Sequence, residues 1–192
     1  MPEAPSPHGR LGPAFEGVLG AAQANAGWAF KAIYEAFAPA ITAYARSQGV
    51  FDPDGLTNEV LFAAFRALHR FRGDEAGFRS WLFTITHNRV IDDRRKRARE
   101  VPRSSRTPEE DALPGGDVEE EVLARLGDAG VRALLDRLTT DQRNVLLLRV
   151  VADLSIAEVA QIVGKPPGAV KALQRRALAA VQRQFEHEGV SL

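Results

Sequence analysis

The sequence contains no cysteine and only four histidines among its 192 residues. The absence of cysteine excludes disulfide bonds, thiolate zinc sites and cysteine nucleophiles. His8, His69, His87 and His187 show no metal-ligand spacing. No apolar run approaches membrane-spanning length, and the Pro- and Gly-rich N-terminus has no apolar core of secretory length. We therefore expect a cytoplasmic protein without membrane insertion, metal or cofactor. No nucleophile or phosphate-binding glycine loop indicates an enzyme.

The total charge is balanced, with 25 basic and 25 acidic side chains, so it predicts nothing about partners. The distribution of charge along the chain is more informative. Residues 89–106 carry a local charge of +5, and residues 107–129 carry a local charge of −7. This asymmetry indicates separate surfaces.

The periodicity of apolar residues is helical throughout, and no segment has the period of a strand. We expect an all-α protein with helices at about 13–24, 28–47, 54–71 and 78–98 in a first domain. Pro39 should bend or split the second of these helices, the DPDG turn at 52–55 should open the third, and residues 72–77 should form a loop.

The predicted organisation is a disordered tail at 1–12, a first domain at 13–99, a flexible acidic linker at 100–117 and a second domain at 118–188. The linker is rich in Pro, Gly, Ser and charge, and so cannot bury a core. In the second domain the helical pattern pauses at 127–130 and resumes. Thr139 and Gln142 have the spacing of a capping box and open a helix through Val150.

Residues 155–184 have the pattern of a helix-turn-helix motif. Ser155 and Glu158 have the spacing of a capping box, Gly164 suits a left-handed helix end, and Pro166 and Pro167 suit the first turn of the next helix. Residues 165–184 contain five Lys or Arg and no acid. A second helix of this kind enters the major groove of DNA. An ordinary helical hairpin with a solvated charged face is the alternative.

The segment 78–100 combines an aromatic first half with a basic second half. Asn88, Asp92 and Arg95 lie about one turn apart and share a polar face. We interpret the segment as a second nucleic-acid contact, with basic groups for phosphates and Asn and Arg for base edges; a basic surface helix is the alternative. Phe71, Phe78 and Trp81 should be mostly core, with one aromatic near the 72–77 loop stacking on an unpaired base. Phe62, predicted to point outward among charges, suggests a partner contact.

Three blocks of the sequence resemble the extracytoplasmic-function (ECF) group of the bacterial sigma-70 family. They begin WAFKAIYEAF, GLTNEVLFAAFRALHRF and LLDRLTTDQRNVLLL and cover about residues 28–98 and 131–185. The resemblance implies a sigma factor that binds core RNA polymerase and directs it to promoters. Its first domain, sigma region 2, would open the −10 element, and its second, sigma region 4, would read the −35 element through the helix beginning near Pro167.

The resemblance also implies the site residues. The −10 contacts would be Arg72, Arg79, Asn88, Arg89, Asp92, Arg94, Arg95 and Lys96. The −35 contacts would be Ser155, Lys165, Pro167, Ala169, Lys171, Ala172, Gln174, Arg175 and Arg176. The face that docks on the β′ coiled coil of the polymerase would be Leu56, Asn58, Glu59, Phe62 and Arg66.

Further partners implied by the resemblance are the polymerase β flap, promoter DNA and an anti-sigma factor. The chain departs from the family pattern at Gly55, where Asp is usual, and at Asn58, where Gln is commoner. In the second domain Ala169, Ala172 and Leu173 replace the more usual Thr, Ser and Arg, so the −35 sequence cannot be taken from the family.

Two other classes of function compete with a sigma factor. A helix-turn-helix regulator that binds an operator without polymerase explains residues 155–184, but leaves the 78–100 block and outward Phe62 unexplained. An adaptor or decoy for an anti-sigma factor, with no DNA role, predicts that Arg175→Ala and Arg176→Ala leave promoter recognition unchanged.

Overall fold

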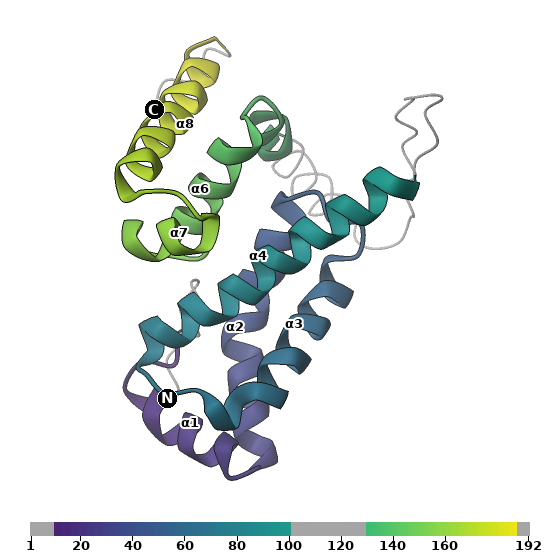
Figure 1. Ribbon diagram of the computed structural model, residues 1–192, viewed down its shortest axis with the longest axis vertical. Helices are drawn as coiled ribbons and strands as arrows, with labels where there is room; N and C mark the ends of the chain where they lie inside the picture. The colour runs from purple at the N-terminus through teal and green to yellow at the C-terminus, as the bar shows by residue number, and fades with distance from the viewer. Residues whose placement is uncertain (1–9, 101–129, 188–192) are drawn as a thin grey trace, which may run out of the picture.

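The computed structural model describes residues 10–100 and 130–187, and every regular element in these two ranges is helical. Within them, no helix is both long enough and apolar enough to cross a membrane. Figure 1 shows the arrangement of the helices. In chain order they are η1 (Gly12–Ala14), α1 (Phe15–Gln23), α2 (Gly27–Ser47), α3 (Pro53–Ala67), η2 (Leu68–Arg70), α4 (Glu75–Glu100), α6 (Thr140–Val150), α7 (Ile156–Val163) and α8 (Pro167–His187).

The first domain packs α1, α2 and α3 with the long helix α4 around an aromatic core. The Phe78 ring lies within 5.6 Å of the rings of Phe15, Phe37, Phe71 and Trp81, measured between centroids. Aromatic rings bury large areas and pack edge to face at such distances. The early residues of α4 are therefore fixed to both α1 and α2 by one buried side chain.

The helix boundaries follow local chemistry, and two of them differ from the sequence-based expectation. Helix α2 runs continuously through Pro39, so this proline does not split it. Asp52 caps α3, accepting a hydrogen bond from the Gly55 amide at 2.8 Å, as the turn chemistry at 52–55 predicted.

The second difference concerns α4, which begins at Glu75 and not at residue 78. The prediction of a loop at 72–77 is wrong for its last three residues. Asp74 accepts a hydrogen bond from the Gly77 amide at 2.8 Å, which is the N-capping chemistry that starts the helix between two glycines.

The second domain forms the predicted helix-turn-helix, preceded by a helical segment at 130–136 and by α6. Both capping boxes are present, one at Thr139 with Gln142 and one at Ser155 with Glu158. Gly164 ends α7 with φ of +64°, in the left-handed region that favours glycine. The predicted tail at 1–12 lies outside the described residues except for its last three residues. The predicted linker at 100–117 also lies outside them except for Glu100, which is the last residue of α4, and so does the helical pattern at 118–129.

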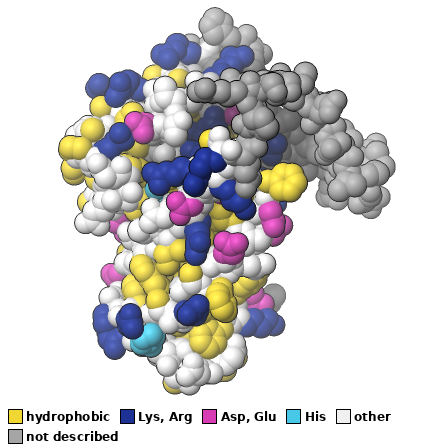
Figure 2. Space-filling view, turned by 45° about the vertical axis from the view of Figure 1, so that its right-hand side comes forward, with side chains coloured by type: hydrophobic (Ala, Val, Ile, Leu, Met, Phe, Trp, Pro, Cys, Tyr) yellow, Lys and Arg dark blue, Asp and Glu magenta, His cyan; other side chains and the backbone are white. Residues whose placement is uncertain are grey.

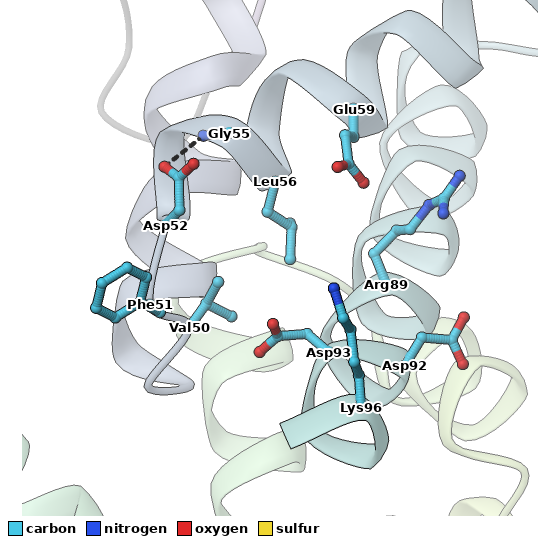
Figure 3. A pocket seen from close by; sticks show the side chains of 10 residues that line it. All are labelled: Val50, Phe51, Asp52, Gly55, Leu56, Glu59, Arg89, Asp92, Asp93 and Lys96. Carbon is cyan, nitrogen blue, oxygen red and sulfur yellow. Dashed lines mark hydrogen bonds between the residues drawn. The ribbon is translucent and has the colours of Figure 1, made fainter. Parts of the chain in front are cut away.

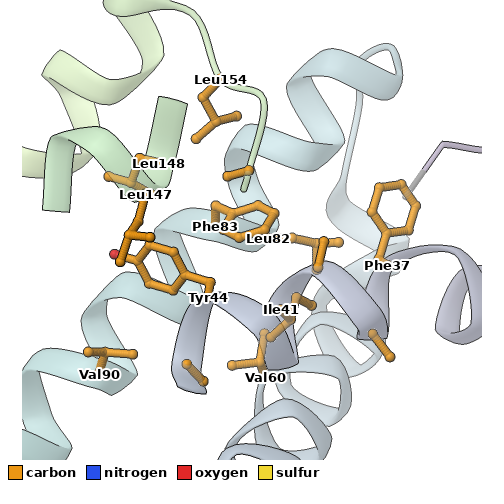
Figure 4. Close-up of a cluster of buried hydrophobic side chains, with 14 of the residues drawn as sticks. Phe37, Ile41, Tyr44, Val60, Leu82, Phe83, Val90, Leu147, Leu148 and Leu154 are labelled. Atoms are coloured by element: carbon orange, nitrogen blue, oxygen red, sulfur yellow. The ribbon is translucent and has the colours of Figure 1, made fainter. Parts of the chain in front are cut away.

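The two domains are in contact, which the sequence did not predict. Leu147 and Leu154 of the second domain lie in one buried cluster with Tyr44 and Phe83 of the first (Figure 4). Beside this cluster, the Gln48 side-chain amide donates to Asn144 Oδ1 at 2.9 Å. The contact therefore has an apolar part and a buried polar part.

His87 lies in the same junction, with 3% of its surface exposed, and its Nδ1 is 2.8 Å from the Tyr44 hydroxyl. Burial lowers the pKa of His87 to about 4, because desolvation disfavours the imidazolium, and the charge of Arg94 acts in the same direction. The folded protein therefore keeps this ring neutral well into the acid range.

We predict that His87 makes the protein acid-sensitive. As pH falls below about 6.5, the unfolded chain takes up a proton that the folded chain binds only near pH 4. Stability is therefore full above pH 6.5 and decreases as pH falls, by about 2 kcal/mol between pH 7 and pH 5. Urea unfolding of the wild type and of His87→Gln should show this loss in the wild type and not in the variant. His69→Gln, a change at an exposed histidine, is the control and should behave as the wild type. Equal acid sensitivity in all three proteins would contradict the prediction.

Candidate nucleic-acid and polymerase interfaces

One side of α4 carries an exposed polar stripe. Asn88, Asp92 and Arg95 follow one another at helical spacing along it, which confirms that they share a face. Arg89 and Lys96 flank the stripe and are also exposed. Figure 2 shows Lys and Arg side chains gathered near the middle of the molecule beside Asp and Glu side chains. Such a surface can bind phosphates and present an amide and a guanidinium to base edges.

The two other arginines predicted on this helix lie on its opposite side. Arg79 is 3% exposed, its guanidinium lies 5.5 Å from the centre of the Phe37 ring, and it donates to the Ala152 carbonyl at 3.5 Å. Arg94 donates to the Gln48 carbonyl at 3.2 Å and to the Gln48 side-chain oxygen. Burial lowers the pKa of both guanidinium groups. Arg79 is therefore held against the second domain, whereas Arg94 is partly exposed and is held by Gln48 of α2.

The loop before α4 is held by contacts from three directions. The Gln23 side chain donates to the carbonyls of Leu68 and Phe71 at 3.1 and 3.0 Å, and Arg72 donates to the Phe71 carbonyl at 2.7 Å. Glu75 accepts hydrogen bonds from the amides of Leu11 and Gly12, so α1 and the segment before it are fixed to this loop. No sequence signal pointed to Gln23, because its partners are backbone carbonyls distant in the chain.

The aromatic side chains at this loop are only partly available. Phe71 is partly buried and stacks on Trp81, with ring centroids 5.3 Å apart, while Phe78 is fully buried. Gly73 has φ of +150° and packs over the Phe71 ring, where an added Cβ would lie 3.2 Å from the ring. Phe71 and Trp81 are therefore the candidates for stacking on an unpaired base, and Phe78 belongs to the core.

Helix α3 presents a second exposed stripe. Asn58, Phe62 and Arg66 recur every four residues and are exposed, Phe62 to 65%. The Arg66 guanidinium lies 5.8 Å from the centre of the Phe62 ring, and Tyr34 of α2 donates to Asn58 Oδ1 at 3.1 Å. Tyr34 thus joins the stripe, although no functional residue was predicted on α2. An exposed phenylalanine between polar neighbours is typical of an interface anchor.

A groove separates α3 from the exposed stripe of α4 (Figure 3). Leu56 and Glu59 line it from α3, and Arg89, Asp93 and Lys96 line it from α4. Leu56 is 8% exposed, so it forms part of the groove floor and not of the outer stripe. Residues predicted to bind polymerase and residues predicted to bind DNA therefore meet at one groove.

The helix-turn-helix presents the N-terminal half of α8. Val170, Leu173 and Ala177 are buried in the domain, whereas Lys171, Arg175 and Arg176 are exposed together with Ser155 and Pro167. Ala169, Ala172 and Gln174 are partly buried between these two faces, as is Lys165, whose ammonium lies 2.9 Å from Asp141. The geometry is that of a recognition helix with a basic outer face.

Comparison with known proteins identifies the family of each of the two domains. Residues 33–100 match the model of Sigma-70 region 2, and residues 129–181 match the model of Sigma-70, region 4. The ECF RNA polymerase sigma factor SigD of Mycobacterium tuberculosis is 32% identical over 78% of this chain and 74% of its own length. The RNA polymerase sigma factor NccH of Alcaligenes xylosoxydans xylosoxydans is 34% identical over 79% of this chain and 84% of its own length.

The chain belongs to the ECF group of the sigma-70 family. These are RNA polymerase sigma factors, which direct transcription initiation and are not enzymes. The ECF sigma factor BldN of Streptomyces coelicolor is 31% identical over 84% of this chain, which spans 62% of the length of BldN.

Solved sigma-factor structures share the fold. CnrH, solved in complex with the cytosolic domain of CnrY, matches 91% of this chain and 98% of its own, with a TM-score of 0.66 and 27% identity. The sigma factor RpoE, solved with the anti-sigma factor NepR from Bartonella quintana, matches 82% of this chain and 96% of its own, with a TM-score of 0.60 and 25% identity.

Two departures from the sigma-factor pattern have a structural explanation. A Cβ on Gly55 would lie 2.1 Å from Asp52 Oδ2, so an Asp at this position requires the capping side chain of Asp52 to move. Leu173 is 9% exposed and packs inward, so this position of the sigma factor contributes to the core of region 4 and not to a DNA contact.

We predict that the exposed stripe of α4 carries phosphate contacts of this sigma factor. Replacing Arg89 or Arg95 by Gln should weaken promoter binding by the polymerase holoenzyme. Each substitution that removes a phosphate contact should also reduce the slope of log K against log salt by about 0.7 to 0.9. Fluorescence anisotropy at several salt concentrations measures this slope. Lys31→Gln, at an exposed position of α2, is the control and should leave the slope unchanged. An unchanged slope in the Arg89 and Arg95 variants would show that other residues bind the DNA phosphates.

Proposed function

We propose that this sigma factor binds core RNA polymerase through the α3 stripe and its groove, opens the −10 element with α4 and the loop before it, and reads the −35 element with α8. The observation that carries the proposal is the presence of two separate exposed surfaces with basic side chains on one chain, the α4 stripe and the outer face of α8. A single helix-turn-helix accounts for α8 alone. It does not account for the exposed stripe of α4, for the hydrogen bonds that hold the loop before α4, or for the exposed Phe62.

The opening step needs no catalytic group. Unstacking a base costs a few kcal/mol, which contacts to the flipped base can offset. Phe71 and Trp81 offer stacking surfaces beside the loop before α4. Asn88 and Arg95 offer hydrogen bonds on the exposed stripe of α4. Arg89 and Lys96 supply positive charge for the strand backbone. Of the other −10 candidates on α4, Arg79 donates to the Ala152 carbonyl of the second domain and Arg94 is held by Gln48 of α2.

Three partners follow from this function. Core polymerase binds through its β′ coiled coil at α3 and its β flap at the second domain, and promoter DNA binds both domains. An anti-sigma factor is the third partner, because RpoE was solved with the anti-sigma factor NepR. Since polymerase and chromosomal DNA are its partners, we place the activity in the cytoplasm, at the nucleoid.

Transcription with purified components tests the proposal. Core polymerase together with this protein should initiate from specific sites on genomic DNA, and sequencing the RNA 5′ ends will give the −10 and −35 sequences. Core polymerase alone is the control. If no genomic promoter is used, and the free protein binds an operator tightly, the chain acts instead as a regulator without polymerase.

We predict that Phe62 anchors the polymerase. Phe62→Ala should reduce the affinity for core polymerase at least tenfold, because a buried aromatic anchor contributes about 2 kcal/mol or more to an interface. The free energy of unfolding should change by less than about 0.5 kcal/mol, since the side chain is exposed. Surface plasmon resonance with immobilised core polymerase measures the affinity, and Glu59→Ala should weaken it as well.

The control for this measurement is Trp28→Ala. Trp28 is aromatic and 60% exposed but lies at the start of α2, outside the α3 stripe and its groove, so its removal should leave the affinity unchanged. Full core binding by both the Phe62 and the Glu59 variants would show that the docking face is misplaced.

A further inference from the structure

A pocket lies where the end of α2 meets the end of α4 and the beginning of the second domain. Its volume is about 410 Å³, which is within the range of small-molecule sites in proteins. Four arginines and one aspartate line it, so these side chains give it a net charge of +3. They are Arg46, Arg97, Arg132, Arg143 and Asp136, and we call the site the arginine pocket. None of its arginines was predicted to contact DNA or polymerase.

Two of the four arginines are fixed in position. Arg97 donates to the Gly49 carbonyl at 2.8 Å and forms an ion pair with Asp93. Arg143 donates through Nε to a backbone carbonyl at 2.9 Å, and its guanidinium pairs with Asp136 at 3.0 Å. A guanidinium carries five N–H donors, so both groups keep donors for a further acceptor. Because these side chains are already ordered, binding an anion costs little of their conformational freedom.

The other two arginines, one from each domain, have no acidic partner among the residues that the structure describes. Arg46 lies in the last turn of α2, Arg132 lies in the helical segment at 130–136, and both are exposed. The positive charges in this region also repel one another. Burial is the main cause that lowers the pKa of the neighbouring Arg94, and the charges of Arg143 and Arg97 lower it further. A bound anion reduces this repulsion, so the pocket favours a ligand with several negative charges.

An exposed aromatic ring lies at the edge of the arginine pocket. Phe51 is 91% exposed and lies between this pocket and the groove beside α3. In Figure 3 its ring points away from Leu56 on the floor of that groove. Aromatic side chains bind nucleobases by stacking, and guanidinium groups bind phosphates through paired hydrogen bonds. The pocket therefore offers a partner for each end of a nucleotide.

We propose that the arginine pocket binds a nucleoside di- or triphosphate, with the phosphates between the guanidinium groups and the base on Phe51. A single phosphate group carries a charge of about −1.5 to −2, so more than one phosphate is needed to balance the charge of the lining. The proposal is independent of the function proposed above, because none of the four arginines is among the assigned DNA or polymerase contacts.

Isothermal titration calorimetry with the full chain tests the site, with ATP, AMP and inorganic triphosphate as probes. ATP should bind with a stoichiometry of one, and AMP should bind at least tenfold more weakly. Arg46→Gln and Arg132→Gln should each reduce the affinity for ATP at least tenfold. Both side chains are exposed and unpaired, so these variants should fold as the wild type. Arg183→Gln, which removes the same charge from an exposed position of α8, is the matched control and should bind ATP as the wild type does.

The role of Phe51 is tested by comparing two probes on one variant. Phe51→Ala should weaken binding of ATP about tenfold, because the base loses its stacking partner. The same variant should bind inorganic triphosphate as the wild type does, since this probe has no base. Phe51→Tyr keeps a ring at this position and should bind ATP with nearly the affinity of the wild type.

Three results would overturn the proposal. The first is that the wild type shows no saturable binding of ATP. The second is an equal affinity for ATP in the Arg46, Arg132 and Arg183 variants, which would mean that the basic surface attracts ATP without a defined site. The third is that a single-stranded DNA tetranucleotide displaces ATP and binds more tightly than ATP in an Arg46-dependent manner, which would assign the pocket to a nucleic-acid strand.

Discussion

The structure depends on the long helix α4, because different faces of this helix lie against the core of the first domain, against the second domain and toward solvent. With 3.6 residues per turn, α4 places Phe78 and Leu82 in the core of the first domain. Arg79, Phe83 and His87 recur at every fourth position toward the second domain, and Arg94 is held by Gln48 at the end of α2. Asn88, Asp92 and Arg95 face solvent. Moving a charged residue by one position along α4 therefore changes whether its side chain faces the core, the second domain or solvent.

Much of the fold follows from the sequence because the signals for it are local. The capping boxes at Thr139 and Ser155, the left-handed Gly164 and the turn that opens α3 at Asp52 were all predicted and are all present. The start of α4 was missed because Asp74 caps the helix within a segment whose two glycines suggested a loop. Local chemistry sets the predicted helix ends and the start of α4 alike. At Asp74 the neighbouring glycines led to the wrong prediction of a loop.

The candidate site was predicted less completely because it depends on contacts that are not local. The sequence does not show that Arg79 donates to the second domain or that Arg94 is held by Gln48 of α2. It also contains no indication of Tyr34 beside Asn58 or of Gln23 holding the loop before α4. Each of these contacts joins positions 24 to 73 residues apart in the chain, so no periodicity within one helix can reveal it.

The domain junction combines an apolar part with a buried polar part, and the two parts have different roles. A wholly apolar junction of leucines would be costly to expose, by about 25 cal/mol for each Å², whereas a junction of unpaired polar groups would not form. Here the leucines supply the attraction, while Gln48, Tyr44 and His87 are satisfied mainly by one another within the first domain. The Asn144 bond and the Arg79 contact cross the junction. Because hydrogen bonds require aligned partners, these two contacts fix the orientation in which the leucines pack.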